Sequence, residues 1–136
     1  MGLASAIPWY TEGFSQRSGI KVTLEMPDEV GRLSPEVEIV IFRLLQESLT
    51  NIHRHSGSGV AQIRLTINSA SVTLEVQDEG KGISPLAEPN NAARTGVGIA
   101  GMRERVKELG GDFQIGSNAS GTLLKVSLPL EIAAPP

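Results

Sequence analysis

The sequence of 136 residues contains no cysteine, which excludes a disulfide framework and a thiolate metal site and is typical of a cytoplasmic protein. It also lacks any apolar run near the roughly 20 residues that span a bilayer, and its N-terminus lacks a signal pattern. An excess of basic residues is missing too, since the net charge is −3 and the pI is near 5.4. We therefore expect a soluble domain that binds neither membrane nor nucleic acid.

What is present is the pattern of one globular domain, with 40% hydrophobic residues in alternating and helical periods. The periods predict strands at 19–26, 60–69, 70–78, 112–117 and 121–130, and helices at 34–56 and 102–111. This order predicts a mixed sheet with helices packed on one face, a two-layer α/β (α+β) sandwich. We interpret 1–18 as the remnant of a preceding linker or helix, 19–130 as the domain, and 131–136 as a disordered tail.

Polar residues recur every four positions along one edge of the long predicted helix, namely Glu47, Asn51 and His55. That edge adjoins an apolar arc made of Val37, Ile41, Leu44, Leu45, Ser48 and Ile52. Asparagine is a poor helix former, and its amide oxygen suits Mg²⁺, whereas Glu47 would hold a water molecule or orient Asn51. The alternative is that all three are boundary residues that reach water.

A second group, DEGKGI at 78–83, follows a predicted strand directly. Asp78 ends the strand, and Gly80 and Gly82 would let a flat polar ligand approach the backbone while the acid accepts its exocyclic amine. An ordinary turn is the equally simple alternative, because Asp and Gly are the commonest turn residues.

The third group, GVGIAG at 96–101, has the spacing G-x-G-x-x-G of a dinucleotide-binding turn. That turn requires a preceding strand, but 84–95 reads SPLAEPNNAART, which has the composition of a loop, so a dehydrogenase is excluded. Gly96, Gly98 and Gly101 lead into the next helix, whose free N–H groups would face an anion. The long loop favours a lid; a plain helix entry is the alternative.

Taken in order, ESLTN, DEGKG, GVGIAG and GTLLKVSLP resemble the N box, the G1 box, the G2 box and the terminal strand of the GHKL ATPase superfamily. More narrowly, FRLLQESLTNIHRHS and GVGIAGMRERVKELGG resemble the ATP-binding catalytic domain of sensor histidine kinases of the NarL/DesK type. The resemblance covers about residues 36–129 and implies the Bergerat fold, with a mostly antiparallel sheet.

The resemblance implies ATP and Mg²⁺ as cofactors and assigns roles to individual residues. Asp78 would accept the adenine amine, helped by Thr122 through an ordered water, and Asn51 would coordinate Mg²⁺. Glu47 matches the acid that activates water in hydrolysing relatives. The remaining residues implied to contact the nucleotide are His55, Gly80, Gly82, Ile83, Gly96, Gly98 and Gly101. The G1 box departs from the commoner D-N-G in having Glu79, which we expect to have little effect.

As for partners, the resemblance implies transfer of the γ-phosphate to a histidine of a dimerisation domain that this chain does not carry, and then to a response regulator through the full-length protein. Neither His53, placed facing solvent, nor His55 is expected to be the phosphorylation site. The expected location is the cytoplasm, either free or within a parent anchored in the inner membrane. Two rival hypotheses remain, a nucleotide-sensing module without phosphotransfer and an anti-sigma-factor serine kinase.

Overall fold

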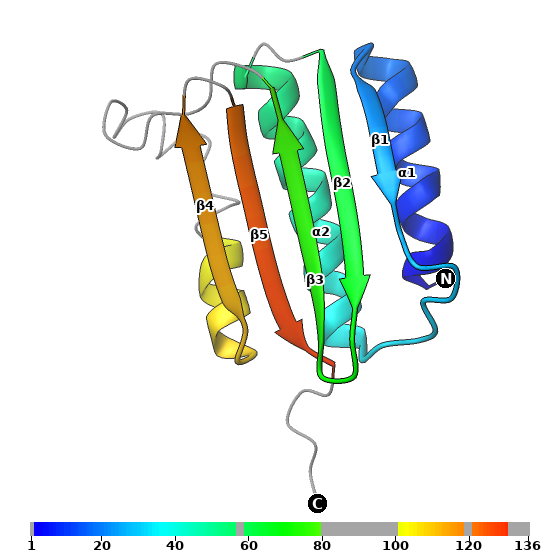
Figure 1. Cartoon of the computed structure of the whole chain (residues 1–136), viewed down its shortest axis with the longest axis vertical. Coiled ribbons are helices and arrows are strands. Elements are labelled where there is room, and N and C mark those ends of the chain that lie inside the picture. Colours follow the sequence, from blue (N-terminus) through cyan, green and yellow to red (C-terminus); the bar gives the residue numbers. More distant parts are fainter. Residues whose placement is uncertain (1, 57–58, 80–100, 119–120, 131–136) are drawn as a thin grey trace, which may run out of the picture.

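The computed structural model describes residues 2–56, 59–79, 101–118 and 121–130, and it has two layers (Figure 1). In chain order the elements are α1 (Leu3–Ser18), β1 (Lys21–Glu25), α2 (Pro35–Asn51), the π-helix η1 (Ile52–Ser56), β2 (Val60–Ile67), β3 (Ser71–Asp78), a helix over 101–108, β4 (Asp112–Asn118) and β5 (Gly121–Pro129). The strands form one sheet in the order β1-β2-β3-β5-β4. Among the described strands, only β1 and β2 pair in parallel, so the predicted mixed, mostly antiparallel sheet is confirmed.

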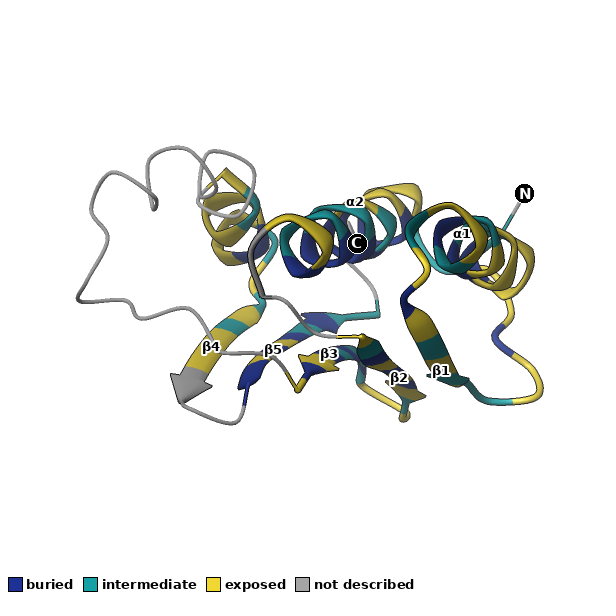
Figure 2. Ribbon diagram, turned by 90° about the horizontal axis from the view of Figure 1, so that it is seen from above, coloured by how far each residue is buried: buried dark blue, intermediate teal, exposed yellow. Residues whose placement is uncertain are grey.

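The described helices lie on one face of the sheet, as Figure 2 shows. Alternation along each strand explains why: Val72, Leu74 and Val76 of β3 are buried under the helices, whereas the residues between them face the open side. The β2–β3 turn is fixed by Asn68, whose side-chain oxygen accepts hydrogen bonds from the N–H groups of Ala70 and Ser71, both at 2.7 Å. The predicted hairpin is therefore confirmed.

Helix α1 packs beside α2 and belongs to the same core as the rest of the domain. Its buried residues, Leu3, Ile7, Thr11 and Phe14, form a stripe at helical spacing, while Trp9 is 69% exposed. The helix ends at Gly19, whose φ of 77° is the left-handed conformation common after helix ends. Helix α1 therefore belongs to the helical layer of this structure, beside α2.

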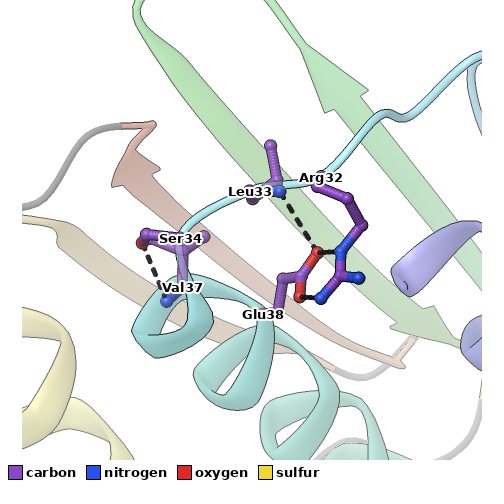
Figure 3. A network of polar contacts seen from close by, with 5 residues as sticks. All are labelled: Arg32, Leu33, Ser34, Val37 and Glu38. Atoms are coloured by element: carbon purple, nitrogen blue, oxygen red, sulfur yellow. Dashed lines mark hydrogen bonds and ion pairs between the residues drawn. The ribbon is translucent and has the colours of Figure 1, made fainter. Parts of the chain in front are cut away.

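Helix α2 begins in a polar cluster that Figure 3 shows from close by. The Ser34 hydroxyl oxygen accepts from the Val37 N–H at 3.4 Å, an N-cap as predicted, with Pro35 in the first turn. The Glu38 carboxylate accepts two bonds from the Arg32 guanidinium, at 2.9 and 3.1 Å, and one from the Leu33 N–H at 3.1 Å. Hydrogen bonding to Arg32 is the main reason that the pKa of Glu38 is lowered.

The apolar arc predicted for the long helix is confirmed, because every residue assigned to it is buried. The predicted helix over 34–56 is helical to its end, but only Pro35–Asn51 is α-helical, and residues Ile52–Ser56 form the π-helix η1. A change of hydrogen-bond register of this kind is frequent at functional sites. Among the described residues, no helix is both long and apolar enough to cross a membrane.

Candidate functional site

A pocket lies between the end of α2, the end of β3 and the start of β5. These ends of the three elements are at the top of Figure 1. The space between the walls of the pocket is about 360 Å³ when the open mouth is included, but only about 30 Å³ of it admits the centre of a water-sized sphere, so the pocket is narrow. The lining residues are Ser48, Asn51, Ile52, Val76, Asp78, Ile115, Thr122 and Leu124. An apolar wall with a few convergent polar groups is typical of a ligand site.

The acid in this pocket is Asp78, the last residue of β3, which is only 3% exposed. Its Oδ1 accepts a hydrogen bond from the backbone N–H of Thr122, at 3.2 Å, across the β3–β5 pair. A buried carboxylate is costly unless it is hydrogen-bonded, and the Thr122 N–H provides such a bond. A carboxylate at the wall of a pocket is also a candidate acceptor for a donor group of a ligand. The structure thus brings together the predicted residues Asp78 and Thr122, which are 44 positions apart.

Gly121 makes the close approach of β5 to this acid possible. A Cβ at that position would collide with the carbonyl oxygen of Asp78 and lie 3.1 Å from its Oδ1. The φ of 145° at Gly121 is also one that residues with side chains rarely adopt. The role of Gly121 depends on strand pairing, so the sequence motifs do not identify this residue.

Helix α2 supplies the second polar side of the pocket. Ser48, Asn51 and Ile52 are three and four residues apart, so they point to the same side of the helix and all line the pocket. Glu47 is half-buried, one turn before Asn51, and is not among the lining residues. The structure therefore places Asn51 in the same pocket as Asp78, with Glu47 beside the site on the helix.

The other predicted site residues lie at the margin of the described chain or outside it. Gly80, Gly82, Ile83, Gly96 and Gly98 fall within 80–100, outside the described residues. The backbone of His55 belongs to η1, but its side chain is outside what the structure describes. Gly101 is exposed at the start of the helix over 101–108. His53 is exposed, as predicted, and its ring meets Phe14 edge-on at 6.2 Å between centroids.

The helix over 101–108 is held tightly against the sheet. Val106 is fully buried, and the Arg103 guanidinium lies 4.9 Å from the ring centroid of Phe113 on β4. The predicted Gly-Gly stop is a Schellman motif: Gly110 donates to the Lys107 carbonyl and Gly111 to the Val106 carbonyl, with a φ of 83° at Gly110. The segment that follows the glycine-rich motif is thus fixed relative to β4 and β5.

A second pocket lies on the open face of the sheet, where Arg64 pairs with Glu25 at 2.9 Å and with Glu75 at 3.8 Å. The charged side chains of this second pocket therefore form ion pairs with one another at an exposed surface. In contrast, the first pocket holds a buried acid and a buried hydroxyl, and we take it as the candidate site.

Within the described residues, no group of three or more His, Cys, Asp or Glu could hold a metal ion. An Asn51-bound Mg²⁺ would be of another kind, with one or two protein oxygens and substrate phosphates.

Comparison with known proteins agrees with this geometry. The sequence profile described as "Histidine kinase-, DNA gyrase B-, and HSP90-like ATPase" matches residues 36–132. Sensor histidine kinase NarS of Mycobacterium tuberculosis is 31% identical over 133 residues, which are 96% of this chain and 30% of NarS. Signal transduction histidine-protein kinase/phosphatase DegS of Bacillus subtilis is 35% identical over 102 residues, 74% of this chain and 26% of DegS.

Among solved structures, the histidine kinase domain of the Erythrobacter litoralis blue-light activated histidine kinase has the same fold. Its TM-score is 0.80 at 24% identity, over 96% of this chain and 62% of that one. The predicted resemblance to sensor histidine kinase domains is thereby confirmed. The chain spans between 26% and 37% of the length of the curated relatives it matches.

Proposed function

Because the chain belongs to the family of histidine kinase-, DNA gyrase B- and HSP90-like ATPases, we propose that it binds Mg-ATP in the pocket between α2, β3 and β5. We further propose that it donates the γ-phosphate to a histidine on the dimerisation domain of a sensor histidine kinase. The observation that carries the proposal is the buried Asp78 carboxylate, held by the Thr122 N–H at the wall of a largely apolar pocket.

The pocket suits adenine for a simple chemical reason. The base has a flat apolar face, for which Val76 and Leu124 are suitable neighbours, and an exocyclic amine that donates hydrogen bonds. Among the described lining residues, Asp78 is the one whose side chain is ionisable, and its carboxylate can accept a hydrogen bond from such an amine. We assign recognition of the amine to Asp78, with Thr122 beside it.

The phosphate side of the site is assigned to Asn51 and to the start of the helix over 101–108. Phosphoryl transfer is mostly positioning and charge stabilisation, and bound Mg²⁺ would supply neutralisation of the phosphate charge. The Asn51 amide oxygen would orient this ion, Glu47 would hold a water molecule or the Asn51 amide, and Gly101 would offer backbone N–H to phosphate. Gly80, Gly82, Ile83, Gly96, Gly98 and His55 remain predicted contacts.

The phosphate acceptor is assigned to another domain. His53 of η1 is exposed, its ring packs edge-on against Phe14 of α1, and it is not among the residues that line the pocket. We therefore expect an external imidazole to approach the γ-phosphate, and the response regulator to receive the phosphate from that imidazole through the full-length kinase. A cytoplasmic location for this domain follows from the same proposal.

Calorimetric titration of ATP, with and without Mg²⁺, tests the binding roles. Asp78→Asn should weaken binding at least about 100-fold in both conditions, because a charged acceptor in a buried site is lost. Asn51→Ala should lose roughly 10-fold, and only when Mg²⁺ is present. Glu75→Gln neutralises a carboxylate of the same strand on its open face and serves as the matched control, with unchanged affinity. Equal binding by Asp78→Asn would refute the adenine assignment.

Phosphotransfer separates the kinase from its rivals. The chain is mixed with Mg-ATP and the dimerisation domain of its parent kinase, and phosphorylated protein is tested for stability in acid. The proposal predicts an acid-labile phosphohistidine on the added domain. Tight ATP binding without transfer would favour the nucleotide-sensing module, and an acid-stable phosphoserine on a protein substrate would favour the serine kinase.

A further inference from the structure

Ser48 has a buried hydroxyl for which the described part of the chain offers no hydrogen-bond partner. The residue lies on the buried face of α2 and is only 6% exposed. Buried side-chain hydroxyls normally find a partner, so an exception in a native core calls for an explanation.

The Ser48 hydroxyl does not stabilise α2 through a hydrogen bond to the backbone of the described helix. A serine inside a helix often donates to the carbonyl four residues earlier, but Ser48 makes no such bond to Leu44. Alanine would be the better helix former here and would bury no unsatisfied group. The neighbours of Ser48 in the arc, Leu44, Leu45 and Ile52, are all apolar and buried. Stability alone therefore favours alanine at this position.

The location of Ser48 supplies the explanation that helix stability does not. The residue lines the same pocket as Asp78 and Thr122, together with the apolar side chains of Val76 and Leu124. A pocket of this kind fixes its ligand by a few well-placed polar groups. Sequences break a local rule most often where a functional site requires it.

We propose that the Ser48 hydroxyl is a nucleobase-binding group, which hydrogen-bonds to the base held by Asp78, directly or through one ordered water. This inference rests on the proposed function and extends it by one residue. A hydroxyl both donates and accepts, so it complements Asp78, whose carboxylate only accepts. The site then contacts the base edge from two elements, β3 and α2, and the base supplies a partner that the described part of the chain does not offer to the Ser48 hydroxyl.

The test compares Ser48→Ala with Thr50→Ala, which removes a half-buried hydroxyl from the same helix outside the pocket lining. Ser48→Ala should weaken ATP binding about 5- to 10-fold, the size expected for one hydrogen bond. Adenosine should lose the same factor, and the ratio of ATP affinities with and without Mg²⁺ should stay unchanged, because the contact is to the base. The melting temperature of ligand-free Ser48→Ala should equal or exceed that of the wild type. Thr50→Ala should bind both ligands as the wild type does.

Each contrary result is informative. Wild-type affinity in Ser48→Ala overturns the inference, as does a loss seen with ATP but absent with adenosine, or a lower melting temperature without ligand. Only the inference about Ser48 fails if the wild type binds ATP, Asp78→Asn does not bind it, and Ser48→Ala binds it with wild-type affinity. If the wild type fails to bind ATP, or Asp78→Asn binds normally, the proposed function fails with it.

Discussion

Gly111, between the helix over 101–108 and β4, is a position where even one added methyl group should lower stability. A Cβ at Gly111 would collide with the backbone carbonyl oxygen of Ser127 and lie 2.7 Å from Leu128 Cδ2 and 2.9 Å from Val106 Cγ1. One of these neighbours is backbone and the other two side chains are fully buried, so none moves freely. Overpacking of a tight core costs about 1–3 kcal/mol, and we place Gly111→Ala at about 3 kcal/mol.

Thermal unfolding followed by circular dichroism measures this cost. For a domain of this size, a loss of about 3 kcal/mol lowers the melting temperature by roughly 10 °C. The matched control is Gly116→Ala on β4, the strand that follows Gly111, where a Cβ meets nothing within 4 Å. That variant should melt at or slightly above the wild-type temperature, since alanine restricts the unfolded chain. A Gly111→Ala protein as stable as Gly116→Ala would refute the packing of this helix against β5.

Two further predictions concern the site wall and the start of α2. Gly121→Ala should abolish ATP binding and lower stability, since its Cβ would meet Asp78, whereas Gly116→Ala should bind normally in the same titration. The pKa of Glu38 in the folded state is lowered, chiefly by its hydrogen bonds to Arg32. Ionised Glu38 therefore stabilises the folded protein at pH values above its unfolded-state pKa near 4.5, and this contribution is lost as the pH falls through the lower folded-state pKa. Glu38→Gln should be about 1 kcal/mol less stable than the wild type at pH 7. In urea unfolding measured from pH 7 to pH 3, its free energy of unfolding should fall less than that of the wild type. An identical pH profile in the two proteins would contradict this role of the Glu38–Arg32 pair.

Much of the fold was predictable because hydrophobic periodicity and helix-capping residues indicate where its strands and helices lie. Alternation in β2 and β3 identified both strands, and Ser34 with Pro35 identified the start of α2. The burial of α1 was harder to predict. Trp9 is exposed while Thr11 is buried, because the position of α1 against α2 and β1 decides which side is covered. The change from α-helix to π-helix after Asn51 likewise depends on tertiary context, which helical periodicity does not contain.

The site was predicted in part, for a related reason. The motifs identified Asp78, Asn51 and Thr122, and the structure places all three around one pocket, although their roles stay predictions. Ser48 was assigned to the apolar arc, because periodicity tells which way a residue faces but not what lies opposite it. Its missing hydrogen-bond partner became visible only in three dimensions. The same holds for Gly121, whose role arises from pairing β5 beside β3.

The most direct test of the account asks where the nucleotide binds. Backbone amide signals of the ¹⁵N-labelled chain are assigned, and ATP with Mg²⁺ is added in steps. We predict that the largest chemical-shift changes fall on Ser48, Asn51, Asp78 and Thr122, while the amides of Glu25, Arg64 and Glu75 on the open face stay unchanged. Changes concentrated on the open face, or none at the pocket between α2, β3 and β5, would contradict the central claim.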